Sequence, residues 1–234
     1  MSVKYIKNIQ QKNPIDVIIP AAGMGRRMKS YGPKSLIKIK KDLTLIENQI
    51  KIIKNTIPNS NIIIVAGFES NLLMNKTPEN IIKLENENYQ NTNVIRSIGI
   101  GLRASQQEVL IIYGDLVFNS ECIENLDFNK SSIVVGKKIM KDSEVGCIVN
   151  KQDKVENMMY DLENKWGQIL FLTGKELNIF KNICWNPENY NMFGFEAINE
   201  TISKGGKIKA CADDKMRIID IDSSKDLERV KEII

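Results

Sequence analysis

Two short apolar runs separated by one amphipathic segment most constrain what this chain can fold into. Residues 16–20 (DVIIP) and 61–67 (NIIIVAG) are apolar on both faces, which is typical of strands buried inside a parallel sheet. Between them apolar residues recur at helical spacing until Pro58: Leu45, Ile46, Ile50, Ile53 and Ile57. The pattern predicts a βαβ unit, for which the crossover is almost always right-handed.

The remaining patterns extend this unit into an α/β fold. Apolar patterning predicts strands over 81–84, 108–115, 132–138, 144–150, 153–160 and 217–222, and helices over 93–106, 175–183, 195–206 and 223–234. From residue 131 onward the strands follow one another through short polar turns, which favours the addition of mixed or antiparallel strands to the parallel sheet. We therefore expect a Rossmann-like three-layer sandwich with a mostly parallel central sheet and antiparallel strands in the C-terminal half.

Composition excludes several classes of function. The 234 residues suit one domain, and a formal charge of +4 is too small to indicate nucleic-acid binding. No apolar run is long enough for a membrane helix and the first residues lack a signal-peptide core, so we expect a cytoplasmic location without membrane association. The four cysteines are widely spaced and are expected to be reduced. The chain contains no histidine, which excludes imidazole as base, nucleophile or metal ligand.

The loop after the first strand has the composition of an anion site. In IIPAAGMGRRMKSYGPKSL (residues 18–36), small residues allow backbone N–H groups to approach a ligand closely: Ala21, Ala22, Gly23 and Gly25. Arg26, Arg27 and Lys34 add positive charge, so a polyphosphate is the ligand that suits the loop best. The alternative is a glycine turn with its arginines on a solvated face. The spacing matches neither the dinucleotide fingerprint nor the P-loop.

At PAAGMGRRM and GPKSLIKI the sequence resembles the nucleotidyltransferases of the sugar-phosphate and alcohol-phosphate pyrophosphorylase superfamily. The resemblance implies a GT-A-like fold in one domain (1–234), with a nucleotide-binding half at about 14–118 and an acceptor-binding half at about 119–234. It also implies nucleotide contacts from the backbone of the loop residues just named, a triphosphate contact from Arg27, and stabilisation of the transferring phosphate by Lys34. Arg26 occupies a variable place in the motif, where a surface role and a phosphate contact are both open.

Two distant acids are candidates for a shared metal ion. Asp115 ends the strand LIIYGD and Asp222 ends RIIDID, and both segments resemble metal-binding motifs of the same superfamily. Mg²⁺ prefers carboxylate, water and phosphate oxygens. The local alternatives are a turn residue for Asp115 and a helix N-cap for Asp222. Asp220, two residues earlier on the same side of its strand, is a secondary candidate.

The segment ENYQNTNVIRSI resembles the superfamily's base-reading loop, which implies nucleobase contacts from Gln90, Asn93 and Ser97. Amide groups suit the donor and acceptor edge of a base, but Asn and Ser also occur at helix starts for local reasons. The same segment resembles small cytidylyltransferases acting on phosphocholine and aminoalkylphosphonates, which favours CTP as the donor.

The resemblance thus implies a Mg²⁺-dependent transfer of CMP to a small phosphorylated or phosphonate acceptor, with release of pyrophosphate, in the synthesis of cell-surface polymer precursors. Sugar-1-phosphate nucleotidyl transfer and a non-catalytic nucleotide-binding role remain alternatives. The lone Trp166 and Trp185 do not predict an aromatic cage for a quaternary ammonium. Arg96, Lys137 and Lys138 are acceptor-phosphate candidates or solvated charges, residues 161–167 are a candidate lid, and a homodimer is possible.

Overall fold

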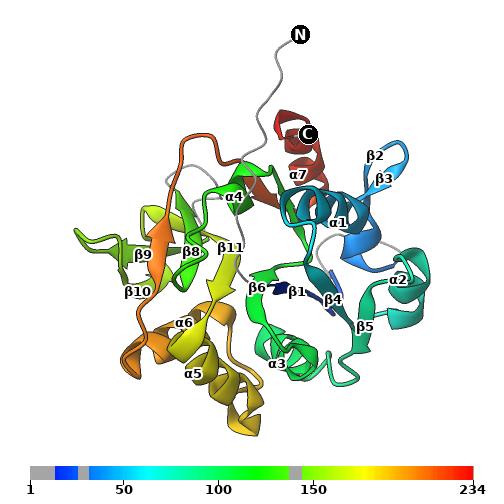
Figure 1. The fold of residues 1–234 in the computed structure, drawn as a ribbon. Helices are drawn as coiled ribbons and strands as arrows, with labels where there is room; N and C mark the ends of the chain where they lie inside the picture. Colours follow the sequence, from blue (N-terminus) through cyan, green and yellow to red (C-terminus); the bar gives the residue numbers. More distant parts are fainter. Residues whose placement is uncertain (1–13, 26–31, 137–143, 234) are drawn as a thin grey trace.

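A central sheet lies between two layers of helices in the computed structural model, which describes residues 14–25, 32–136 and 144–233 (Figure 1). Four neighbouring strands are parallel, in the order β6 (Glu108–Ile112), β1 (Ile15–Ala21), β4 (Asn61–Ala66) and β5 (Ile82–Glu85). The antiparallel strand β11 (Asn164–Leu172) adds beyond β6. The expected α/β sandwich with a mostly parallel sheet is confirmed.

Strand β1 shows why there are three layers. Successive side chains of a strand point to opposite faces of the sheet. Val17 and Ile19 accordingly pack in one cluster with Ile46 and Ile53 of α1 (Leu45–Thr56), whereas Ile18 packs in the other with α3 (Val94–Ala104). All these side chains are fully buried, so β1 is the centre of the molecule.

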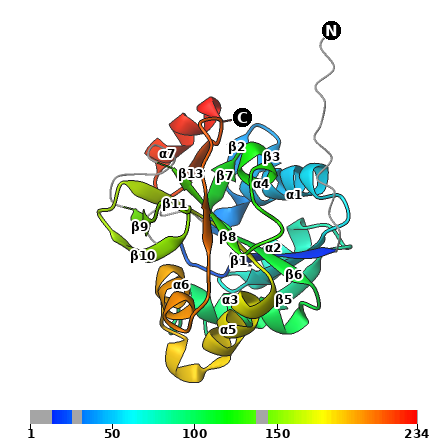
Figure 2. The same ribbon diagram turned by 60° about the vertical axis from the view of Figure 1, so that its left-hand side comes forward.

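The C-terminal half extends the sheet with antiparallel strands. β11 lies between β8 (Ser132–Gly136) and β9 (Val145–Val149), and β10 (Val155–Tyr160) follows β9 at the sheet edge. β12 (Lys209–Cys211) pairs in parallel with β8. Helices α5 (Gly174–Trp185) and α6 (Gly194–Ser203) lie on the same side of the sheet as α3 (Figure 2).

Smaller elements complete the chain. α2 (Ser70–Lys76) follows β4, and α4 (Glu121–Glu124) follows the three-residue strand β7 (Leu116–Phe118). β7 pairs with β13 (Ile218–Asp220) in a separate two-stranded sheet, after which α7 (Ser224–Arg229) begins. A second small sheet joins β2 (Lys38–Lys40) to β3 (Leu43–Thr44), and short 3-10 helices cover Lys34–Leu36, Pro187–Asn189 and Val230–Glu232.

Strands β8 and β9 are consecutive in the chain but are not paired, because β11 inserts between them. One expectation from the sequence is wrong in detail. Residues 164–167, expected to belong to a lid, form the start of β11, and Trp166 is buried at 4% exposure. The paired backbone and the buried indole prevent this part of the segment from opening as a loop.

Candidate active site

The loop after β1 lies where the order of the sheet reverses. From β1 the chain proceeds outward to β4 and β5, and it then returns to β6 on the other side of β1. Crevices at such reversals, beyond the carboxyl ends of parallel strands, are the usual ligand sites of open α/β sheets. A pocket of about 590 Å³ opens there, a volume within the range of small-molecule sites.

The backbone of the loop is fixed by its neighbours. The carbonyl of Pro20 accepts a hydrogen bond from the Gly114 N–H at 3.2 Å, and that of Ala22 accepts one from the Phe68 N–H at 3.1 Å. A Cβ on Gly67 would lie 2.7 Å from the Ala22 Cβ, so this close approach requires glycine. A Cβ on Gly23, in contrast, would meet no atom of the described residues within 4 Å. Gly23 therefore leaves room on the pocket side, as a backbone that approaches an anion must.

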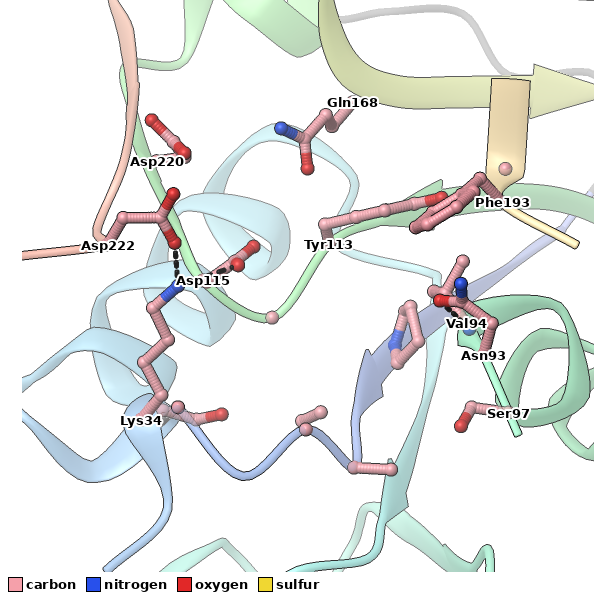
Figure 3. Close-up of a pocket in the computed structure, with 18 of the residues that line it drawn as sticks. Lys34, Asn93, Val94, Ser97, Tyr113, Asp115, Gln168, Phe193, Asp220 and Asp222 are labelled. Atoms are coloured by element: carbon pink, nitrogen blue, oxygen red, sulfur yellow. Dashed lines mark hydrogen bonds and ion pairs between the residues drawn. The ribbon is translucent and has the colours of Figure 1, made fainter. Parts of the chain in front are cut away.

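Lys34 joins the two acids that the sequence suggested. Its Nζ donates to Asp115 Oδ2 at 3.0 Å and to Asp222 Oδ1 at 2.7 Å, and all three residues line the pocket (Figure 3). Burial lowers the pKa of Lys34, but the charges of Asp115 and Asp222 together with their hydrogen bonds outweigh it, so the pKa is raised above its ordinary value. The ammonium is therefore fully charged at neutral pH.

The small sheet of β7 and β13 brings the two acids together. The Ile221 N–H donates to the Asp115 carbonyl at 2.9 Å, next to the pairing of Asp220 with Leu116. The buried Gln49 side chain of α1 donates to the carbonyls of Tyr113 and Leu116, at 2.9 and 2.8 Å, and so fixes the turn that contains Asp115.

Helix α7 fixes the backbone at Asp222, the second of the two acids that contact Lys34. The Asp226 side chain at the start of that helix accepts from the N–H groups of Asp222 and Ser223, at 3.1 and 2.7 Å. Asp222 thus follows a strand of this separate sheet, and not a strand of the central sheet as its strand-end position suggested.

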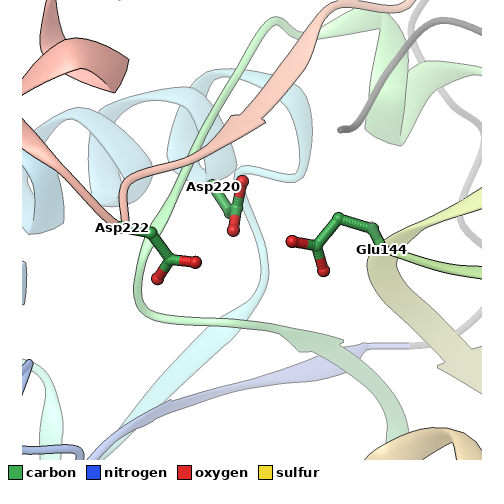
Figure 4. A group of neighbouring side chains, drawn as sticks. All are labelled: Glu144, Asp220 and Asp222. Atoms are coloured by element: carbon green, nitrogen blue, oxygen red, sulfur yellow. The ribbon is translucent and has the colours of Figure 1, made fainter. Parts of the chain in front are cut away.

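A third acid joins Asp220 and Asp222. Carboxylate oxygens of Glu144, Asp220 and Asp222 lie within 4.8 Å of one another, and Figure 4 shows Glu144 facing the two aspartates across the pocket. Oxygen atoms at this spacing suit a hard divalent cation. Glu144, just before β9, was not predicted, because it is remote in sequence from both aspartate motifs.

The proposed base-reading side is organised around Asn86. Its Nδ2 donates to Thr92 Oγ1 at 3.2 Å and to the buried Ser97 Oγ at 3.1 Å. Asn93 caps α3, accepting from the Val94 N–H at 2.8 Å. Asn86, Thr92, Asn93 and Ser97 line the pocket, whereas the exposed Gln90 does not. Nothing in the sequence distinguished Asn86 from the other asparagines of this segment.

The other predicted residues lie as follows. Ala21, Ala22, Gly23 and Gly25 line the pocket, and Gly25 has a left-handed backbone with φ of 56°. Arg26, Arg27, Lys137 and Lys138 lie outside the described residues. Arg96 does not line the pocket. Its guanidinium lies 4.5 Å from the centre of the Tyr190 ring, and its Nη1 donates a hydrogen bond to the Tyr190 hydroxyl at 3.0 Å.

Two more pocket residues come from the junction of β6 and β11. Gln168 has a left-handed backbone, with φ of 56°, where the pairing of β11 with β8 shifts register. Such strained bulges often place a side chain at a functional site. Tyr113 lies beside Gln168. Burial of the Tyr113 hydroxyl, and to a smaller extent the negative charge of Asp115, raise the pKa of Tyr113 far above its ordinary value, so the hydroxyl stays protonated.

Comparison with known protein families identifies the family of the chain. The model of the MobA-like NTP transferase domain matches residues 17–135, just over half of the chain. This chain belongs to that family. It is therefore a nucleotidyltransferase, and the matched segment contains the loop after β1, Lys34 and Asp115. A sequence comparison with curated proteins gives no match.

Solved structures agree on the fold over nearly the whole chain. The CTP:phosphocholine cytidylyltransferase from Streptococcus pneumoniae is 19% identical, with a TM-score of 0.73 over 93% of this chain and 98% of that one. The inositol-1-phosphate CTP transferase from T. maritima is 16% identical, with a TM-score of 0.72 over 93% and 96%. A nucleoside-diphosphate-sugar pyrophosphorylase from Vibrio cholerae is 13% identical, with a TM-score of 0.68 over 92% and 99%. At these identities the likeness concerns the fold.

Members of the family generally use a divalent metal, and the acids above are candidates to bind it. No helix in the described ranges combines the length and apolar character needed to cross a bilayer.

Proposed function

We propose that the protein transfers CMP from CTP to a small phosphorylated or phosphonate acceptor and releases pyrophosphate. The observation that carries this proposal is the convergence of Lys34, Asp115 and Asp222 in the pocket beyond β1. We also propose that about residues 14–118 form the nucleotide-binding half of the chain and about residues 119–234 the acceptor-binding half.

The reaction needs charge neutralisation more than proton transfer. A phosphate or phosphonate oxygen is already an anion, so it can attack the α-phosphorus without a general base. Lys34 holds a full positive charge beside the two acids, and Ala22 and Gly23 line the same pocket. We assign to Lys34 the neutralisation of charge on the transferring phosphate and to the loop, with Arg27, the binding of the triphosphate. A chain without histidine can perform this chemistry.

The acids fit a magnesium ion by their chemistry. Asp115, Asp220, Asp222 and Glu144 offer only carboxylate oxygens, and Mg²⁺ prefers oxygen ligands shared with water and substrate phosphates. We assign Asp115 and Asp222 as its protein ligands, with Asp220 and Glu144 adjacent. When bound, the ion would neutralise triphosphate charge.

CTP is favoured because residues 89–98 (YQNTNVIRSI) resemble the corresponding segment of small cytidylyltransferases, and because two of the structural neighbours are described as CTP-dependent enzymes. Asn93 and Ser97 are the proposed base contacts of the predicted set, with Asn86 added. The sugar pyrophosphorylase among the neighbours keeps a sugar 1-phosphate as the second candidate acceptor.

Pyrophosphate release tests the proposal. The protein would be incubated with CTP, UTP, GTP or dTTP, a panel of phosphorylated and phosphonate acceptors, and Mg²⁺. We expect release that requires both an acceptor and the divalent ion and is fastest with CTP. Calorimetry would detect NTP binding in parallel. Tight NTP binding without pyrophosphate release over a broad acceptor panel would contradict the proposal and favour a non-catalytic nucleotide-binding role.

A further inference from the structure

A buried amide orders two hydroxyl groups at one side of the pocket. Asn86, the residue after β5, is 2% exposed, and its backbone N–H donates to the Ala66 carbonyl at 2.8 Å. Its side-chain Nδ2 donates to Thr92 Oγ1 at 3.2 Å and to Ser97 Oγ at 3.1 Å. Both of these hydroxyl residues line the pocket. One fixed amide therefore determines how two polar groups of the pocket use their hydrogen atoms.

A third hydrogen bond fixes the orientation of this amide. The Asn88 N–H donates to Asn86 Oδ1 at 3.2 Å, which places the carbonyl oxygen on the side of Asn88 and the NH₂ group on the side of the hydroxyls. The reverse orientation would set an NH₂ group against an N–H group, two donors without an acceptor. Because an NH₂ group can only donate, Thr92 and Ser97 each use one lone pair to accept from it.

Thr92 has no hydrogen left for a ligand. Its hydroxyl donates to the Asn88 carbonyl at 2.8 Å and accepts from Asn86, so one lone pair of Oγ1 remains. A hydroxyl group has a single hydrogen and two lone pairs. Toward a ligand, Thr92 is consequently an acceptor and not a donor.

Ser97 has the opposite polarity. Its Oγ accepts from Asn86 and donates to none of the described residues, although the residue is only 3% exposed. Thr201 of α6 donates instead to the carbonyl of Ala197, four residues earlier in its helix, a bond that Ser97 does not make in α3. Ser97 lies beside Asn93 at the α3 side of the pocket (Figure 3). A buried hydroxyl that donates to nothing is costly, so its hydrogen is available to a ligand.

We propose that Asn86 is a positioning residue that gives the pocket an acceptor at Thr92 and a donor at Ser97, and that this polarity selects a base with an amino group beside a ring-nitrogen acceptor. The inference rests on the proposed nucleotidyl transfer and specifies how its donor is chosen. Cytosine has this pattern at N4 and N3, and adenine has it at N6 and N1. Uracil, thymine and guanine have a carbonyl beside a ring N–H, which sets acceptor against acceptor and donor against donor. A site whose buried polar groups the wrong ligand leaves unpaired discriminates strongly.

Nucleotide binding measures this selection without depending on turnover. Calorimetry with Mg²⁺ would give the dissociation constants of CTP, UTP, ATP and GTP, and pyrophosphate release would be followed in parallel. CTP and UTP match in ring size, as do ATP and GTP, so each pair isolates the polarity. We expect CTP to bind about 10–100-fold more tightly than UTP, the range set by leaving buried polar groups unpaired. The comparison of CTP with ATP identifies which amino-bearing base is the donor.

Asn86→Asp replaces the NH₂ group by an oxygen of similar size. The carboxylate can only accept, so the Ser97 hydroxyl would donate to it and turn a lone pair toward the ligand. The ratio of CTP to UTP affinity should fall about 10-fold or more, because the N3–H of uracil gains an acceptor. Asn86→Ala should lower the ratio without favouring UTP. A purely structural role of Asn86 would weaken all four nucleotides to the same extent.

Variants of the hydroxyls and of a neighbouring asparagine provide the controls. Thr92→Val removes the acceptor with little change of shape and should lower the ratio of CTP to UTP affinity, whereas Thr92→Ser should retain it. Asn91→Asp adds the same charge as Asn86→Asp at an exposed position outside the pocket and should leave the ratio unchanged. Circular dichroism would verify the folding of every variant.

Equal affinity of the wild type for CTP and UTP would overturn the inference. So would an unchanged ratio in folded Asn86→Ala and Thr92→Val. Both results would leave nucleotidyl transfer intact, since pyrophosphate release is measured separately. Selective nucleotide binding without pyrophosphate release from any acceptor would instead count against the proposed function, and the role of Asn86 in selecting the base would stand.

Discussion

Replacing Lys34 by alanine tests the centre of the site most directly. The Lys34 side chain is 12% exposed and is bonded to two carboxylates that are 32% and 24% exposed. If Lys34 neutralises the transferring phosphate, its loss removes a preorganised charge from the transition state. Removal of one such group typically costs about 10²–10³ in kcat, or about 3–4 kcal/mol. We expect a decrease of this size in acceptor-dependent pyrophosphate release.

The same substitution should affect stability much less. Breaking a fully buried ion pair costs about 3–5 kcal/mol and breaking an exposed one about 0.2–1 kcal/mol. Because Asp115 and Asp222 keep access to water, the free energy of unfolding should fall by an intermediate amount, about 1–2 kcal/mol. Urea denaturation of the variant and the wild type would measure the difference, and the rate should be compared under conditions where both are folded.

Lys209→Ala is the matched control. Lys209 donates to Asp127 at 3.1 Å, a similar contact to a single carboxylate, and its side chain is 37% exposed. Neither residue lines the pocket. The control should lower stability by less than about 1 kcal/mol and leave kcat unchanged. If Lys34→Ala retained the wild-type rate, or if both variants lost activity equally, the role assigned to Lys34 would be wrong.

The pKa of Lys34 sets the expected pH dependence. Burial opposes the charged form, but Asp115 and Asp222 outweigh it, so the pKa in the folded protein lies above the unfolded value. The stabilisation from this group is therefore fully present below the unfolded pKa and is lost as the pH rises through the folded pKa. Neither kcat nor stability should show a loss attributable to Lys34 between pH 7 and 9, about one pH unit or more below the ordinary lysine value. Deprotonation of Lys34 within that range, followed by NMR, would contradict this.

Three further predictions concern the loop, one helix and the cysteines. Gly23→Ala should weaken CTP binding about 10-fold without loss of stability, since the new Cβ meets no atom of the described residues within 4 Å. Gly67→Ala should instead lower stability by about 1–3 kcal/mol, because its Cβ would overlap Ala22. Calorimetry measures the CTP affinity and urea denaturation the stability, and unchanged CTP affinity of Gly23→Ala would contradict the loop assignment. Thr44→Ala disrupts the reciprocal hydrogen bonds between Thr44 and Glu47 at the start of α1 and should lower the free energy of unfolding by about 1 kcal/mol. A variant that unfolds at the same urea concentration as the wild type would contradict this. Four cysteines are buried, and burial raises the pKa of each thiol: Cys122, Cys147, Cys184 and Cys211. A thiol reagent at pH 8 should therefore react far more slowly with the native protein than with the unfolded one. Rapid labelling of the native protein would contradict this.

Local sequence patterns were sufficient to predict those elements whose pattern lies within one continuous segment. The apolar run of β1 and the periodicity of α1 depend on neighbouring residues only, and both elements match their predicted positions to within a residue or two. The loop that follows β1 was predicted for the same reason, because glycine content and charge are properties of a continuous segment. The pairing of β11 between β8 and β9 was not predictable in this way, since strand order depends on contacts between distant segments.

The sequence by itself determined the α/β class, the phosphate-suited loop and the residue types available for chemistry, which are lysine and carboxylates in a chain without histidine. Only the tertiary structure decided which of these residues meet. The contact of Lys34 with Asp222 spans 188 positions, and it depends on a two-stranded sheet formed by segments about a hundred residues apart. The same holds for Glu144, whose carboxylate lies close to those of Asp220 and Asp222. Convergence of this kind is a property of chain topology and packing, which no local window of sequence contains.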